Sequence, residues 1–294
     1  RIAQVYTIET CENIAPGTCQ GSIQITYTRL DGTAAVCSQK ITVTVTPREL
    51  SVTSPDVTRD KVYDGTDYAQ VTAGNLKGVV SGDNVSVSAR AFYDDVNAGE
   101  NRLITVSYTL SGADSDKYLP PEDDVYKNGS IRKAEGSAAV AIGSWRVGEP
   151  ARSPELSNVT EGLGTVSYFY KRKGAADNEY RTSVPTGEGN YIIKAVFAES
   201  TNYKETQATN EFSISYIDTP QNAFSLSGVM GKNGWYVSDV NIFPADGYTI
   251  ASECDGSYGG SCTVGGSVRA ADIYLKNADG AVTRAIRVGD ILID

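Results

Sequence analysis

Apolar and polar residues alternate with period two in many short runs of this chain. Residues 23–27 read Ile-Gln-Ile-Thr-Tyr and residues 41–46 read Ile-Thr-Val-Thr-Val-Thr. Such runs are typical of strands with one face on a core and the other in water. Asp31-Gly32 lies between the runs and favours a hairpin turn, because Gly adopts positive φ at no steric cost. We therefore expect two half-buried strands in residues 1–47, as the C-terminal part of a β module that Pro47 ends.

Similar runs continue to the end of the chain, with Gly and Asp between them at intervals of ~8 to 12 residues, the spacing of small antiparallel sandwiches and barrels. No window has the 3.6-residue apolar stripe of a helix, so we expect very little helix. Residues 191–197 are apolar on both faces except at Lys194, which predicts a central strand covered on both sides. The expected strands are 50–52, 69–71, 85–89, 104–110, 129–131, 140–142, 165–170, 191–197, 212–216, 235–237, 248–250, 273–275 and 286–288.

This pattern predicts an all-β chain of tandem small antiparallel β-sandwich modules of the Ig-like kind. A β-grasp-like arrangement of the same strands is the alternative. Linkers at Pro47, at residues 133–136 and at Pro220 are short, which favours an extended array. The expected divisions are a partial module at 1–47, complete modules at 48–134 and 135–218, and a C-terminal module at 219–294.

Charge and composition exclude several classes of partner. The 294 residues hold 26 Lys plus Arg against 36 Asp plus Glu, a net charge of -10, which disfavours nucleic acid and anionic membrane surfaces. The chain contains no run of ~18 apolar residues, so we do not expect membrane insertion. The chain lacks a start Met and a signal segment, so we take it for a piece of a longer protein. It contains no histidine, which removes the usual general base and the usual metal ligand.

The five cysteines predict an oxidising compartment. Cys11 and Cys19 enclose turn-forming residues, and so do Cys254 and Cys262. A tight turn can bring such ends within the ~5.5 Å that a disulfide needs between Cα atoms, so two local disulfides are preferred over free thiols. Cys37 is left over, and its partner is either upstream sequence or one of Cys11 and Cys19.

Residues 62–66, 78–83, 93, 97–99 and 110–114 form a series of short turn and strand motifs. Their order along the chain resembles that in repeats of large bacterial surface adhesins, and the likeness extends over residues 48–294. Residues 61–133 look like the YDG repeat, residues 135–218 resemble MBG-type and related Ig-like repeats, and the end is similar to a third repeat type of the same proteins. The resemblance implies extracellular, cell-surface or cell-wall-attached modules with no catalytic residue and no cofactor. Cysteines are unusual in such repeats. The stretches that carry the YDG likeness are Val62-Tyr63-Asp64-Gly65-Thr66, Gly78 to Asp83, Tyr93, Asn97-Ala98-Gly99 and Leu110 to Asp114.

Most candidate sites have a structural explanation beside a functional one. Tyr63 to Thr66 is either a ligand loop or, preferably, a Tyr anchored in the core before a turn that the Asp64 carboxylate stabilises. Acidic clusters are read as solvated loops, with calcium as the alternative, since Ca²⁺ takes 6 to 8 oxygen ligands. Lys61 and Asn128, near opposite ends of one module, raise the idea of an isopeptide crosslink. The acidic clusters are Asp94-Asp95, Asp114 with Asp116, and Glu122-Asp123-Asp124.

The aromatic residues offer a second surface to consider. Trp145 and Trp235, with Tyr168 to Tyr170 and Tyr236, are either a sugar-stacking platform or, more simply, core plugs and cross-strand pairs. The ligand surface we consider in the last module consists of Trp235, Tyr236, Tyr248 and Tyr258.

The sequence thus predicts a non-catalytic stalk or spacer fragment of a secreted or cell-surface bacterial adhesin. Its expected partners are the neighbouring modules of the same chain. The alternative is a module that binds host glycan or extracellular protein through the loop between Cys254 and Cys262, which a disulfide would pre-organise. An enzyme is not expected, because modules of ~80 residues rarely enclose the ~300 Å³ that an active site needs.

Overall fold

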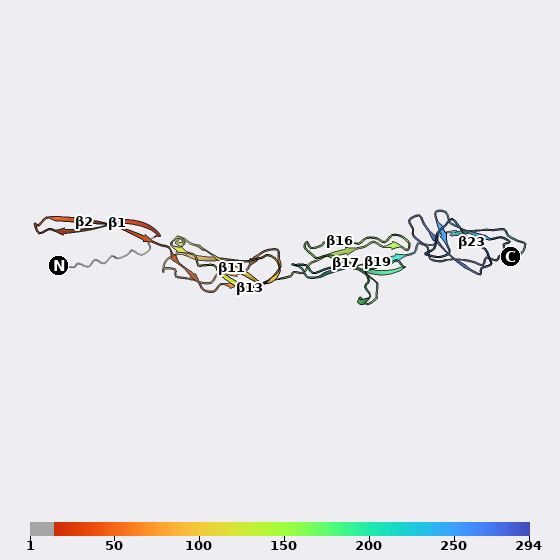
Figure 1. Cartoon of the computed structure of the whole chain (residues 1–294), viewed down its shortest axis with the longest axis horizontal. Coiled ribbons are helices and arrows are strands. Elements are labelled where there is room, and N and C mark those ends of the chain that lie inside the picture. The colour runs from red at the N-terminus through yellow and green to blue at the C-terminus, as the bar shows by residue number, and fades with distance from the viewer. Residues whose placement is uncertain (1–14) are drawn as a thin grey trace. The chain divides into compact units, whose positions relative to one another are not determined.

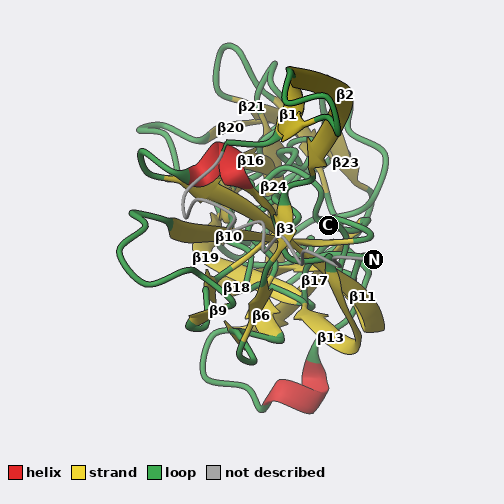
Figure 2. Ribbon diagram, turned by 90° about the vertical axis from the view of Figure 1, so that its left-hand side faces the viewer, coloured by secondary structure: helices red, strands yellow, loops and turns green. Residues whose placement is uncertain are grey.

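The computed structural model describes residues 15–294, which divide after Ala134 into two compact units. Strands dominate both units, and Figure 2 shows two single helical turns, η1 (Ser115–Lys117) and η2 (Asp177–Glu179), as the helical elements of the described residues. The all-β prediction is confirmed. Across residues 15–294, no helix has the length and apolar character needed to cross a membrane.

The described part of the first unit includes a long hairpin of β1 (Gly17–Thr28) and β2 (Ala34–Val45), coloured red and orange in Figure 1. Its turn has Gly32 at φ +82°, and the Asp31 carboxylate accepts the Thr33 backbone N–H at 2.9 Å. The two strands and their Asp-Gly turn are therefore as predicted.

The burial predicted for this hairpin is wrong. Its apolar face holds Ile23, Ile25 and Tyr27, whose exposed fractions are 39%, 41% and 49%. Nearly every residue of both strands is exposed, because no described strand packs over the apolar face as a second layer. The alternation of apolar and polar residues therefore predicted the two strands correctly, but the predicted burial of one face was wrong.

The rest of the first unit, called here the first module, is built on a five-stranded sheet in the order β6-β13-β11-β10-β7. Three two-stranded ladders, β3/β12, β4/β9 and β5/β8, accompany it. Ile104 and Val106 from β11 and Ile131 from β13 are fully buried in its core. The bounds are β3 (Arg48–Glu49), β4 (Ser51–Val52), β5 (Asp56–Val57), β6 (Asp60–Val62), β7 (Tyr68–Ala69), β8 (Val71–Thr72), β9 (Leu76–Lys77), β10 (Ser86–Tyr93), β11 (Gly99–Ser111), β12 (Tyr118–Leu119) and β13 (Asp124–Arg132).

The second unit starts with the second module, a sheet in the order β15-β19-β18-β17 with a β14/β16 ladder. Strand β18 is central, as predicted for residues 191–197, but only one of its faces is buried, while Ile192, Lys194 and Val196 are half-exposed. The prediction of cover on both sides was therefore wrong. The bounds are β14 (Ala139–Ala141), β15 (Trp145–Arg146), β16 (Glu155–Ser157), β17 (Val166–Arg172), β18 (Gly189–Phe197) and β19 (Thr206–Ser215).

The third module contains two three-stranded sheets, β20-β21-β23 and β22-β24-β25. Val240 and Ile242 from the first sheet and Leu275 from the second share one buried core. Residues 235–237, predicted as a strand, make only isolated bridges in the structure. The bounds are β20 (Phe224–Ser227), β21 (Val240–Pro244), β22 (Thr249–Ala251), β23 (Cys262–Val264), β24 (Ala271–Lys276) and β25 (Ile286–Val288).

Three strand pairs are parallel, although an antiparallel arrangement was expected: β6 with β13, β3 with β12, and β15 with β19. In each pair the strand that comes first in the sequence is two or three residues long. These short strands lie beside a distant later strand, so their direction depends on tertiary packing rather than on a local turn.

Backbone hydrogen bonds join the second module to the third. The Ile217 N–H donates to the Val282 carbonyl at 3.1 Å, and the Val282 N–H donates to the Val147 carbonyl at 2.9 Å. Val282 and the adjacent Thr283 are buried. The segment that links the two modules is thus itself paired with the third module.

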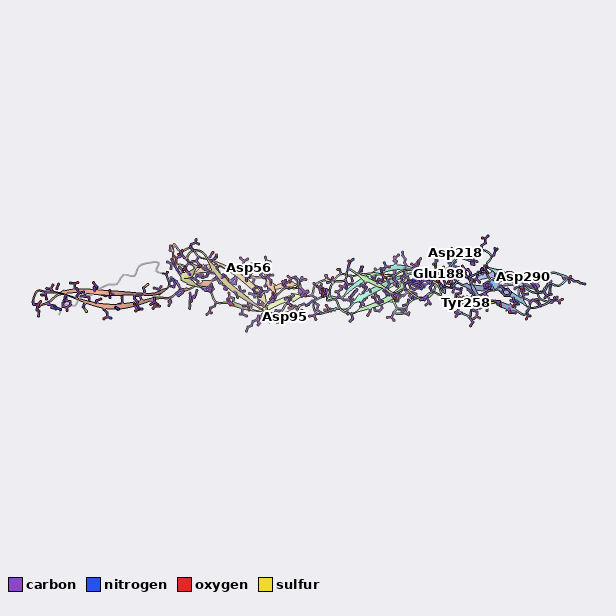
Figure 3. All side chains as sticks on the ribbon, turned by 90° about the horizontal axis from the view of Figure 1, so that it is seen from above. Asp56, Asp95, Glu188, Asp218, Tyr258 and Asp290 are labelled. Carbon is purple, nitrogen blue, oxygen red and sulfur yellow. The ribbon has the colours of Figure 1, made fainter. Side chains whose placement is uncertain are left out.

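Two glycines allow this close approach. Gly148 has φ +93°, and a Cβ placed on it would lie 2.3 Å from the Gly280 carbonyl oxygen. Gly280 also has φ +93°, and its own Cβ would lie 3.1 Å from the Gly148 carbonyl oxygen. At the rim of the junction Glu188, labelled in Figure 3, forms an ion pair with Arg284.

Candidate functional site

The turn at Tyr63 to Thr66 is held by its own side chains. The Asp64 carboxylate accepts the Thr66 backbone N–H at 2.9 Å and the Thr66 hydroxyl at 2.8 Å. Tyr63 packs against the core of the first module, and Gly65 has φ +81°. These contacts support the structural explanation of the motif: each of its residues has a role in shaping the turn.

The Lys61 ammonium group donates hydrogen bonds to several groups of this turn. Its Nζ donates to the Asp64 carboxylate at 2.8 Å, to the Thr66 carbonyl at 2.7 Å and to the Tyr68 carbonyl at 3.1 Å. The side chain is only 14% exposed. Asn128, which we considered as its crosslinking partner, instead accepts a hydrogen bond from Arg59 at 3.2 Å. The structure therefore does not bring Lys61 and Asn128 together.

Acid should weaken this turn. The hydrogen bond from Lys61 is the main cause that lowers the pKa of Asp64 from 3.8 to about 2. A carboxyl group whose pKa is lower in the folded state stabilises the fold above its unfolded pKa, and that contribution is lost as pH falls through the folded value. We expect the first module to lose stability between about pH 4 and about pH 2 through this group.

Urea titrations that follow NMR amide signals of β10 and β11 measure this loss. The Asp64→Asn variant is the control, because every other carboxyl group is unchanged. Its stability should fall less steeply with pH than that of the wild type over the same range. Identical pH dependence in the two proteins would contradict the role assigned to Asp64.

The acidic clusters do not converge on a common point. Asp95 pairs with Arg102 at 2.9 Å and Asp114 with Lys117 at 2.8 Å, while the Asp124 carboxylate accepts the Tyr108 hydroxyl at 2.6 Å. Within residues 15–294, no group of three or more Asp, Glu, Cys or His side chains is placed to hold a metal ion. Nothing in these clusters adds support to the calcium alternative.

Four aromatic residues of the second module, Trp145, Tyr170, Tyr191 and Phe212, are core residues, whereas Phe169 lies outside this core beneath the Lys194 ammonium. Trp145 is 4% exposed and stacks on Phe212 with ring centroids 4.9 Å apart. Tyr170 meets Phe212 edge-on at 6.2 Å and Tyr191 stacks on it at 5.6 Å. Trp145 therefore fills the core of its module, in line with the simpler of the two explanations.

The four residues considered as a ligand surface in the third module do not form one patch. Tyr236 and Tyr248 pack against the core. Tyr258, labelled in Figure 3, donates its hydroxyl to the Cys254 carbonyl at 2.8 Å, and the Lys276 ammonium lies 3.9 Å from its ring centroid. Burial is the main cause that raises the pKa of Tyr258 to about 12. Trp235 alone of the four is largely exposed.

The predicted disulfide between Cys254 and Cys262 is absent, and both thiols are free. Cys262 begins β23 and packs against the module core, where burial raises the pKa of its thiol. Cys254 follows β22, a strand of the other sheet. Burial is the main cause that raises the pKa of Tyr216, and the charge of Cys254 and a hydrogen bond with it raise that pKa further. Cys262 thus lies in a strand of one sheet, while Cys254 lies in the turn that follows a strand of the other sheet.

The N-terminal cysteines are also unbonded where they are described. Cys19 lies opposite Val43 and Cys37 lies opposite Ile25, six positions away along the hairpin ladder. At about 3.4 Å per residue this separates them by roughly 20 Å, too far for a bridge. Cys11, the predicted partner of Cys19, lies outside the described residues.

A small hairpin in the third module has features that the sequence analysis missed. The Gly231 N–H donates to the Trp235 carbonyl at 2.7 Å, the Val237 N–H donates to the Val229 carbonyl at 2.8 Å, and Met230 bridges to Tyr236. A groove of about 420 Å³ lies on this hairpin. Its lining residues are Gly231, Lys232, Asn233, Trp235, Val237 and Asp294. The Asn233-Gly234 turn pair between apolar residues is the sequence signal that could have found it.

Comparison with known proteins assigns a family to part of the first unit. Residues 46–124 match the YDG domain. The YDG match includes the Lys61-to-Thr66 turn and β10, and thus residues 61–124 of the 61–133 stretch in which we identified the YDG resemblance. No curated protein matches the chain. A crystal structure of the FN1–FN3 domains of chicken CNTN1 is similar at 10% identity and a TM-score of 0.22, over 83% of this chain and 99% of that one. A likeness at that TM-score has no weight for fold or function.

Proposed function

We propose that the chain is a non-catalytic spacer segment of a bacterial cell-surface adhesin. The YDG domain and the all-β fold are consistent with a structural or binding module. The adhesin, the bacterial source and the extracellular location are the further steps of the proposal, and the resemblance of residues 48–294 to adhesin repeats motivates them.

The hydrogen-bonded junction between the second and third modules is the observation that carries the spacer role. A rigid spacer must hold successive modules in a fixed relative orientation. The backbone of its linker must therefore be restrained by contacts with the modules. Ile217, at the end of the second module next to the linker, pairs with Val282, and Val282 pairs back to Val147. Because these backbone groups are paired across buried residues, bending at the linker would break hydrogen bonds and expose apolar surface.

The alternative of ligand binding through the loop between Cys254 and Cys262 has weaker support. That idea relied on a disulfide to pre-organise the loop, and the two thiols are free. The loop is tied instead by the hydrogen bond from the Tyr258 hydroxyl to the Cys254 carbonyl.

Antibodies raised against the described residues test the proposed location. Intact cells of the source organism should be stained, and brief treatment with an external protease should remove the staining. An antibody to a cytoplasmic protein, negative until the cells are permeabilised, serves as the control. Staining that requires permeabilisation would contradict the cell-surface proposal.

A further inference from the structure

We propose that the groove on the 229–237 hairpin binds a neutral pyranose ring of an oligosaccharide, with the Trp235 indole as the stacking surface. This inference does not depend on the spacer role, because it concerns one face of the third module and not the junction. It would give the third module a binding activity of its own.

The hairpin presents its apolar side chains to solvent. Side chains alternate between the two faces of a strand, so Val229, Trp235 and Val237 lie on the face opposite Tyr236, which packs against the core. Val229, Trp235 and Val237 are 61%, 44% and 52% exposed. These three side chains therefore share the solvent-facing side of the hairpin, where a ligand could reach them.

Gly231 keeps the groove open. A Cβ on this residue would lie 2.8 Å from Val237 Cγ1, so a side chain there would displace Val237 or occupy the space beside Trp235. The groove volume of about 420 Å³ lies within the range of about 300 to 1,000 Å³ of small-ligand sites. Gly231, which has no side chain, and Trp235 both line the groove.

The polar groups around the indole match the chemistry of a sugar. Lys232 supplies only donors, Asp294 supplies only acceptors, and the Asn233 amide supplies both. No described residue forms a hydrogen bond or ion pair with the side chains of Lys232 and Asn233. A pyranose ring has hydroxyl groups that donate and accept at its rim, and an apolar C–H face that suits the negative face of an indole.

Other ligand classes fit this groove less well. A stable protein interface uses about 20 to 30 residues on each side, far more than this hairpin presents. An anionic sugar would meet the Asp294 carboxylate in a chain of net charge -10. A neutral saccharide avoids both problems.

Tryptophan fluorescence gives a direct test, because Trp145 is buried and Trp235 is exposed. Acrylamide quenching of the whole chain therefore reports mainly on Trp235. The probes are lactose, N-acetyllactosamine, cellobiose and chitobiose, with sialyllactose as the anionic comparison. We expect at least one neutral disaccharide to protect Trp235 from quenching in a saturable way, and sialyllactose to protect it less. If no neutral probe protects Trp235, the proposal is overturned.

Variants separate stacking from general stability. Saturation-transfer NMR with the protecting sugar should show binding at least about tenfold weaker for Trp235→Ala, while Trp235→Phe keeps most of it. Gly231→Ala, whose new Cβ would lie 2.8 Å from Val237 Cγ1 in the groove lining, should also weaken binding. Phe243→Ala is the matched control, since Phe243 is a 41% exposed aromatic of the same module outside the groove. Wild-type affinity in Trp235→Ala with an unchanged amide spectrum would overturn the proposal, whatever the outcome for the spacer role.

Discussion

Replacing Lys61 with Met is expected to destabilise the first module by about 1 to 3 kcal/mol. Lys61 Nζ donates to the Asp64 carboxylate and to the carbonyls of Thr66 and Tyr68; the Lys61 side chain is 14% exposed and that of Asp64 is 55% exposed. Met fills a similar volume but donates no hydrogen bond, so the carboxylate and the two carbonyls would lose this donor. Urea unfolding followed by NMR amide signals of β11 and β13 measures the change.

Lys127→Met is the matched control for this experiment. Lys127 is exposed on β13 of the same module, so the same chemical change should alter stability by no more than about 0.5 kcal/mol. Equal effects of the two substitutions would mean that the lysine-centred turn does not stabilise the module. The comparison therefore tests whether the contacts of Lys61 stabilise the first module.

Replacing Gly148 with Ala is expected to open the junction between the second and third modules. Its positive φ costs a non-glycine residue roughly 1 to 2 kcal/mol, and the new Cβ would lie 2.3 Å from a backbone oxygen that cannot turn away. We expect the exchange of the Ile217 and Val282 amide hydrogens to accelerate by about a hundredfold, which corresponds to about 3 kcal/mol.

Gly174→Ala controls for backbone strain alone. Gly174 has φ +86°, and nothing lies within 4 Å of the position of its Cβ, so this substitution adds strain without a clash. It lies in the second module and should leave the exchange of the Ile217 and Val282 amides unchanged. Acceleration by both variants would show that general loss of stability, and not the junction, was being measured.

The local features of this fold could be predicted from the sequence because their causes are local. Alternation over residues 104–110 predicted β11, and the Asp31-Gly32 pair predicted the turn of the first hairpin. The role of Asp64 also follows from chemistry within three residues. In each case the residues that determine the structure are neighbours in the chain.

Features that depend on distant partners could not be predicted. The parallel pairing of β6 with β13 joins residues about seventy positions apart, and no local pattern specifies its direction. The spacing of Cys254 and Cys262 suggested a bridge, but spacing does not show that β22 and β23 belong to different sheets. Likewise, alternation in β1 and β2 does not say whether another layer covers them.

The candidate sites divide in the same way. The ligand surface considered in the third module included Trp235. Tyr236, Tyr248 and Tyr258 were grouped with Trp235 only because all four are aromatic. The structure turns Tyr236 and Tyr248 to the core and leaves Trp235 on the outer face of a hairpin. The face that Trp235 occupies is decided by the pairing of residues 235–237 with residues 229–231 across the Lys232-to-Gly234 turn. The sequence predicted a strand at residues 235–237 but no partner strand for it.

Amide hydrogen exchange of the unmodified chain tests the spacer account most directly. The spacer account requires that the backbone hydrogen bonds at the junction of the second and third modules are formed in the native state. It predicts that the Ile217 and Val282 amide hydrogens exchange nearly as slowly as those of the central strand β18. Exchange at the rate of an open loop, with β18 still protected, would show that the linker is free to bend and would contradict the spacer role.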